Sequence, residues 1–105
     1  MAYPVTHDAG TRQLTAHVDG RQSLLQYRLE GGTMTIVHTE VPTELAGHGI
    51  AADLMRAALE MARANGWRVR PACSYAQAFL QKHTEYADLL VQPNRADAAG
   101  PSSAA

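Results

Sequence analysis

Two glycines, Gly47 and Gly49, stand between a run that favours β-structure and a run rich in alanine and leucine. Glycine weakens a helix interior by roughly 0.5–1 kcal/mol relative to alanine, so this pair indicates unusual torsion angles or a close approach of the backbone to something. Larger apolar residues then recur at helical spacing over residues 50–65, and Asn65-Gly66 provides a stop. The sequence therefore predicts a strand, a glycine loop and a helix in succession.

Three β-prone runs precede the glycine loop, at residues 12–18, 21–30 and 33–42. The dipeptides that separate them are Asp19-Gly20 and Gly31-Gly32, which supply the positive φ angles that two-residue hairpins need. Proline has no backbone N–H, so Pro42 ends the third run. This pattern predicts an antiparallel meander.

Residues 67–73 predict a short fourth strand that ends at Pro71, and residues 74–90 predict a second helix with Ser74 as its N-cap. We expect three residues of this helix to face inward: Tyr75, Phe79 and Leu80. A helical crossover joins parallel neighbours by a right-handed connection, so the 67–73 strand should lie parallel to the 33–42 strand. The predicted fold class is α+β, with a mixed sheet and two helices.

The N-terminus of the predicted 50–65 helix is a candidate anion site. Free N–H groups and the positive end of the helix dipole converge there, and Gly47 and Gly49 let the backbone wrap around a phosphate without intervening side chains. The structural alternative is that the two glycines only form a loop and allow close packing of the helix on the sheet. Their spacing alone leaves both interpretations open.

Length, composition and net charge limit the number of domains and the classes of partner that this chain can have. A chain of 105 residues that is 46% hydrophobic and 18% charged fits one domain, which we place at 7–91, and the polar 92–105 segment should be a disordered tail. The net charge of −1 gives no footprint for nucleic acid, and no apolar run approaches the roughly 18 residues of a membrane helix. A single cysteine forms no internal disulfide, and the first residues lack a signal-peptide pattern. We expect a cytoplasmic protein, a monomer or weak dimer.

The segment "ELAGHGIAADLM" resembles the acetyl-CoA pyrophosphate motif of the GNAT N-acetyltransferase superfamily. Residues 7–91 as a whole resemble the small single-domain branch of that superfamily, with "HTEVP" before the loop, "PAC" at the end of the next strand and "HTEYADLL" at the close. The resemblance implies a curved mixed sheet with CoA between its third and fourth predicted strands. It also implies transfer of an acetyl group from acetyl-CoA to a primary amine, on a small molecule or a protein lysine.

The same resemblance implies a set of CoA-binding residues. They are Thr39, Val41, Gly47, His48, Gly49, Ile50, Ala51, Ala52, Ala76 and Phe79. The chain departs from the family pattern at Ala46, where a basic residue usually opens the loop, and only His48 is positioned nearby to substitute for it. This departure bears on affinity for CoA more than on the fold.

Three residues are candidates for catalysis. By resemblance, Cys73 belongs to the active site as an acyl-accepting nucleophile or as a group near the CoA sulfur, although a free cysteine is often only a small buried hydrophobe. His38 and Glu40 point to one face of their strand, so they can act as a base and its orienting partner. The alternative for this pair is a solvated carboxylate and a histidine bonded within the sheet.

Two further expectations concern the function class. We expect no metal, because the spacing of His38, His48, Cys73 and His83 does not match the paired ligands that zinc sites use.

Larger members of the superfamily build their acceptor pocket from elements that this chain does not have. A CoA-binding or acyl-CoA-binding module, or an interaction module on the same fold, without efficient turnover, is therefore the alternative to an acetyltransferase.

Overall fold

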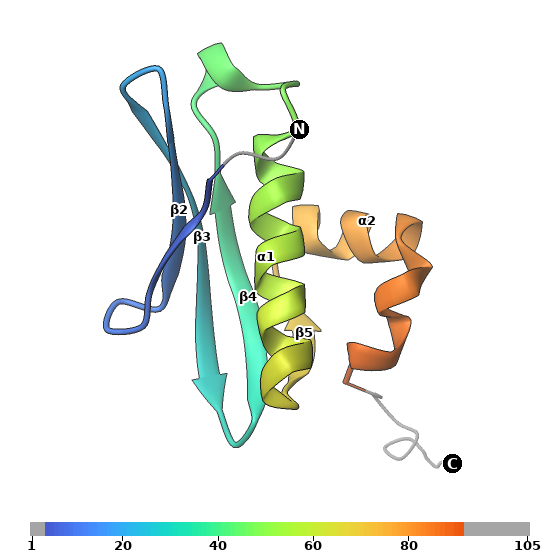
Figure 1. Cartoon of the computed structure of the whole chain (residues 1–105). Helices are drawn as coiled ribbons and strands as arrows, with labels where there is room; N and C mark the ends of the chain where they lie inside the picture. The colour runs from blue at the N-terminus through green and yellow to red at the C-terminus, as the bar shows by residue number, and fades with distance from the viewer. Residues whose placement is uncertain (1–3, 92–105) are drawn as a thin grey trace.

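The computed structural model describes residues 4–91 and contains one five-stranded sheet with strands in sequence order. The strands are β1 (Thr6–Asp8), β2 (Gln13–Val18), β3 (Arg21–Glu30), β4 (Thr33–Glu40) and β5 (Arg68–Pro71). Antiparallel pairing joins β1 to β2, β2 to β3 and β3 to β4, and β5 pairs in parallel with β4. The crossover between β4 and β5 contains α1 (Ile50–Asn65), which runs along the sheet (Figure 1). The predicted α+β mixed sheet is confirmed.

The hairpin turns have the expected geometry. Asp19 and Gly20 have φ angles of 53° and 74°, and Gly31 and Gly32 have φ angles of 56° and 79°. Positive φ at both central residues is the type I′ arrangement, whose twist matches that of the flanking strands. These turns fix the register of β2, β3 and β4.

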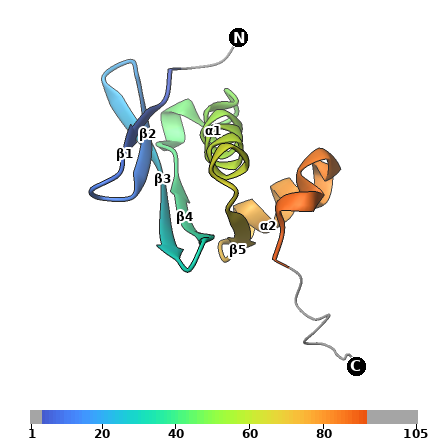
Figure 2. The same cartoon turned by 60° about the horizontal axis from the view of Figure 1, so that its bottom comes forward.

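Helix α1 spans the predicted residues and covers one face of the sheet. Its buried side chains are Ile50, Leu54, Met55, Ala58, Leu59 and Ala62. The helix ends at Gly66, whose φ of 70° is left-handed and whose N–H donates to the carbonyls of Ala62 and Arg63. In Figure 2 both α1 and α2 (Ser74–Lys82) lie on one side of the sheet, and within residues 4–91 no helix covers the other face.

Three details differ from the sequence predictions. Strand β1 was not expected, and it adds a fourth strand to the meander. The second helix ends at Lys82 rather than continuing to residue 90, because His83 leaves helical torsion angles with φ −107° and ψ 79°. The chain then forms a 3-10 helix, η2 (Thr84–Leu89), which turns Tyr86 and Leu89 back into the core. The predicted tail, residues 92–105, lies outside the described residues.

A β-bulge interrupts the pairing of β3 with β4. Gln26 pairs with His38 and Tyr27 pairs with Ile36, so Val37 is an extra residue on β4. Such a bulge reverses the alternation of side chains along the strand. As a result Ile36 and Thr39 lie on the helix-covered face, together with their partners on β3, and His38 lies on the open face.

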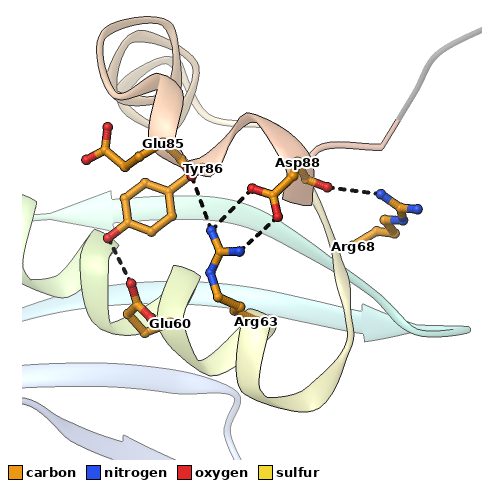
Figure 3. Close-up of polar contacts among 6 residues, drawn as sticks. All are labelled: Glu60, Arg63, Arg68, Glu85, Tyr86 and Asp88. Carbon is orange, nitrogen blue, oxygen red and sulfur yellow. Dashed lines mark hydrogen bonds and ion pairs between the residues drawn. The ribbon is translucent and has the colours of Figure 1, made fainter.

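Polar contacts hold η2 against α1 and β5 (Figure 3). Arg63 binds both carboxylate oxygens of Asp88, at 2.8 and 3.2 Å, and also donates to the carbonyl of Glu85. Arg68 donates to the carbonyl of Asp88, and the Tyr86 hydroxyl donates to Glu60 at 3.1 Å. The contact between Arg63 and Asp88 is bidentate, which fixes the orientation of both side chains.

The Arg63–Asp88 contact predicts a pH dependence of stability. The hydrogen bond from Arg63, and its charge, lower the pKa of Asp88. A carboxylate with a lowered folded-state pKa contributes stability above its unfolded value of about 3.9, and this contribution disappears as the pH falls through the folded-state pKa. Asp88→Asn should therefore lower the melting temperature slightly at pH 7, and the difference from the parent should vanish in acid, once the pH has fallen through the folded-state pKa of Asp88.

The control for this prediction is Glu30→Gln, which removes an exposed carboxylate for which the described structure contains no hydrogen bond or ion pair. This variant should have the melting temperature of the parent at pH 7 and in acid. A difference between Asp88→Asn and the parent that persists unchanged in acid would contradict the assignment of the effect to the charged pair.

Candidate functional site

A pocket of about 300 Å³ lies at the N-terminal end of α1. Its lining comes from the residue after β4, the 3-10 helix η1 (Thr43–Leu45), the glycine loop, the first turn of α1 and the first turn of α2. The lining residues are Val41, Leu45, Ala46, Gly47, Gly49, Ile50, Ala51, Ala52 and Tyr75. Most of these side chains are small or apolar, so much of the polar character of the pocket must come from the backbone.

The glycine loop exposes this backbone. Gly47 and Gly49 have φ angles of 84° and 83°, a left-handed conformation that side chains disfavour. A Cβ atom added at either glycine would meet no atom within 4 Å, so neither glycine is required by close packing. Close packing of the helix on the sheet therefore does not explain these two glycines. The positive φ angles of the loop do explain them, because other residues disfavour those angles.

Helix α1 starts without a side-chain cap, with Gly49 as its N-cap. The carbonyl of Gly49 accepts the N–H of Asp53 at 3.0 Å, which is the first bond of the helical ladder. The N–H groups of Ile50, Ala51 and Ala52 precede that bond and have no partner within the helix. Such groups, together with the helix dipole, favour an anion at this position.

Strands β4 and β5 separate beside the pocket. Strand β5 ends at Pro71, and the N–H groups of Ala72 and Cys73 both donate to the carbonyl of Ile36, at 2.9 and 3.1 Å. Beyond that point, in the part of the chain that the structure describes, β4 pairs only with β3. The second half of β4 therefore has a free edge next to Cys73.

Cys73 is the N-cap of α2, a position that the sequence had suggested for Ser74. Its sulfur accepts the N–H of Ala76 at 3.4 Å and lies 3.7 Å from the Thr39 hydroxyl. The Ser74 prediction was wrong because the helical torsion angles begin at Ser74 itself. The half-buried thiol consequently stands where β4 and β5 separate, with Thr39 as its neighbour.

His38 and Glu40 lie together, as predicted, with His38 Nε2 3.4 Å from Glu40 Oε1. Their side chains are 58% and 66% exposed, so both are accessible to a molecule from solvent. The bulge at Val37 places them on the open face of the sheet, whereas Thr39 and Cys73 contact each other on the helix-covered side. The structure thus does not bring the three candidate catalytic residues into one cluster.

The predicted CoA-binding residues fall into four groups. Those that line the pocket are Val41, Gly47, Gly49, Ile50, Ala51 and Ala52. Thr39 and Ala76 contact the Cys73 sulfur, and Phe79 lines an adjoining pocket of about 220 Å³ that shares Ala52 and Tyr75 with the first. The exposed side chain of His48 is not among the residues that line either pocket.

Sequence reasoning missed Leu45 and Tyr75 as lining residues, and Ala46 was noted only for the charge that it lacks. The signal for Tyr75 was its position one residue before Ala76 at the start of a helix. Burial raises the pKa of Tyr75, and the Arg56 guanidinium partly opposes this shift, so the phenol remains a proton donor at neutral pH. Tyr75 can therefore offer a hydrogen bond at the boundary of the two pockets.

No helix within residues 4–91 has the length and apolar character to cross a membrane. In the same part of the chain, no group of three or more His, Cys, Asp or Glu side chains is arranged to hold a metal ion.

Comparisons with known proteins agree with this architecture. The family model for GCN5-related N-acetyltransferases matches residues 13–89. Protein NATD1 of Bos taurus is 34% identical over 82 residues, covering 75% of this chain and 73% of that protein, and the Homo sapiens protein of that name is 32% identical with the same coverage. The solution structure of a GCN5-like candidate N-acetyltransferase from Staphylococcus aureus superposes with a TM-score of 0.69 at 26% identity, covering 85% and 88% of the two chains. The chain therefore belongs to the GCN5-related N-acetyltransferase family and, as such, is an acyltransferase.

Proposed function

We propose that the chain transfers the acetyl group of acetyl-CoA to a primary amine. The observation that carries this proposal is the proximity of two features, the uncapped glycine loop at the start of α1 and the separation of β4 from β5. Val41 and Tyr75 line the pocket at the loop, and Thr39, two residues before Val41, contacts the Cys73 thiol. A ligand with a phosphate end and a thioester end matches this pair of features.

The residues at the pocket fit CoA chemically. Backbone N–H groups of residues 47–52 would hold the pyrophosphate. The apolar side chains of Val41, Leu45 and Ile50 would contact the uncharged arm of CoA between the pyrophosphate and the thiol. The loop contributes no cation at Ala46, so binding of the pyrophosphate rests on N–H donors and the helix dipole. Phe79 and Lys82 line the adjoining pocket, and we assign them to the part of CoA beyond the pyrophosphate.

Acetyl transfer to an amine forms a C–N bond and breaks the C–S bond of the thioester. An acceptor present as an ammonium ion must lose a proton before its nitrogen can attack, and the departing thiolate must gain a proton. We assign acceptance of the amine proton to His38, oriented by Glu40, on the open face. We assign to Cys73 either a place beside the CoA sulfur or the role of an acyl acceptor that passes the acetyl group to the amine.

Titration with CoA by calorimetry, followed by an acetyl-CoA turnover assay with a mixture of amines, tests this proposal. We expect saturable one-to-one binding and acceptor-dependent release of free CoA thiol. Binding without turnover would overturn the assignment of transfer and favour a CoA-binding or acyl-CoA-binding module. Absence of binding would overturn the assignment of the pocket as well.

A further inference from the structure

The described arginines divide into two groups by their contacts. The arginines with a polar partner are Arg12, Arg21, Arg56, Arg63 and Arg68. Arg28 and Arg70 are exposed, and neither guanidinium group makes a hydrogen bond, ion pair or ring contact within residues 4–91. An exposed arginine without a partner is ordinary by itself, so the relative placement of these two residues decides what they can do.

Arg28 and Arg70 occupy one row of the sheet. Arg28 on β3 pairs with Thr35 on β4, and Thr35 pairs with Arg70 on β5. Their Cα atoms are therefore roughly 10 Å apart, because neighbouring strands are separated by about 4.8 Å. The adjacent row of Leu29, Met34 and Val69 faces the helices, so the arginine row lies on the open face.

The arginine row adjoins the His38–Glu40 pair on the same face. Gln26, the cross-strand partner of His38, precedes Arg28 by two residues, which is about 7 Å along a strand. On the other side of the arginine row, Glu30 on β3 and Arg68 on β5 flank Thr33 on β4. Three arginines and one carboxylate therefore lie in these two rows, and the open face presents a potential base next to a region of net positive charge.

We propose that the acceptor is a lysine in an acidic segment of another polypeptide, and that carboxylates flanking this lysine bind Arg28 and Arg70. This inference rests on the proposed acetyl transfer and specifies its acceptor. Guanidinium groups bind carboxylates with paired N–H donors, and two of them side by side repel each other until an anion compensates their charge. A polypeptide suits the site because the face is open, whereas small-molecule sites are usually concave.

Three matched peptides test the proposal with the full chain and acetyl-CoA. Each contains one lysine with a free side-chain amine, blocked ends, and flanking residues that are both glutamate, both glutamine or both arginine. We expect kcat/KM for the glutamate peptide to exceed that for the glutamine peptide by about tenfold at low salt, and to fall as salt is added. Equal values for the glutamate and glutamine peptides would overturn the proposal.

Two variants and a control test whether Arg28 and Arg70 cause the preference for the glutamate peptide. Arg28→Gln and Arg70→Gln should reduce the preference for glutamate to within about twofold, without changing the KM for acetyl-CoA. Arg12→Gln, which removes an arginine bonded to the Leu29 carbonyl, should keep the preference. A preference for glutamate that survives in both test variants would place carboxylate recognition elsewhere.

Direct binding separates this inference from the proposed activity. If CoA binds but no peptide is acetylated, the proposed transfer fails, and fluorescence polarisation of the labelled glutamate peptide then reports on the surface alone. Peptide binding that requires both arginines would support the surface, and equal binding by the parent and both variants would overturn it. Acetylation of 6-aminohexanoate in preference to the glutamate peptide would overturn the assignment to a polypeptide.

Discussion

Replacing Gly49 with valine should weaken CoA binding by about 100-fold or more, which corresponds to the loss of one or two charge-assisted hydrogen bonds. Gly49 has a φ of 83°, and a β-branched residue disfavours that conformation strongly. The loop would therefore shift and turn its N–H groups away from the phosphates. In the parent conformation the new side chain would occupy the open space beside the pocket lining.

Gly66→Val is the matched control for this experiment. Gly66 has a φ of 70°, stands at the other end of α1, and also has open space around an added Cβ atom. Both variants should lose about 1–2 kcal/mol of stability from left-handed strain, and calorimetry should find weakened CoA binding only for Gly49→Val. Equal affinity of Gly49→Val and the parent for CoA would reduce the loop to a structural element.

Cys73→Ala should keep CoA binding and lose transfer activity, with kcat lower by on the order of 100-fold. The thiol lies where β4 and β5 separate and contacts the Thr39 hydroxyl, so its removal changes the reacting end of the site and leaves the phosphate loop intact. Acetyl-CoA should also protect Cys73 from alkylation. Ser74→Ala, at the neighbouring position that does not cap α2, should leave kcat unchanged.

Cys73→Ser separates the two roles assigned to this residue. A serine hydroxyl can still accept the N–H of Ala76 and so cap the helix, but it is a far weaker nucleophile at neutral pH. Activity retained in this variant would exclude an acyl-cysteine intermediate and favour direct attack by the amine. A native thiol inert to alkylating reagents, together with a loss of stability alone in both Cys73 variants, would identify the residue as part of the core.

Local signals were sufficient for most of the fold. The hairpins followed from Asp19-Gly20 and Gly31-Gly32, and the bounds of α1 followed from apolar spacing between two glycines. Strand β1 was missed because its three residues are all exposed and show no alternation of polar and apolar side chains. The end of α2 was missed because packing of Tyr86 against α1, and stacking of His83 on Phe79, determine it.

The site was predictable where it depends on the backbone and less so where it depends on strand pairing. Gly47 and Gly49 indicated the pocket because few other contexts require two left-handed residues before a helix. No local sequence pattern indicated the bulge at Val37. The sequence therefore could not predict that His38 and Cys73 lie on opposite faces of the sheet. The roles assigned to Cys73, His38 and Glu40 remain predictions.

The parallel pairing of β4 with β5 differs from the meander in how it should fold and open. The meander pairs residues close in sequence, whereas β5 pairs with β4 over four residues across a crossover that contains α1. Closing this connection costs more loop entropy than closing a hairpin, so we expect the pairing to form late in folding and to open early. The pocket lining and Cys73 belong to that late part. Because acetyl-CoA, the proposed ligand, would bind only the closed form, we expect it to shift the opening equilibrium and to slow amide exchange in β5 and α2.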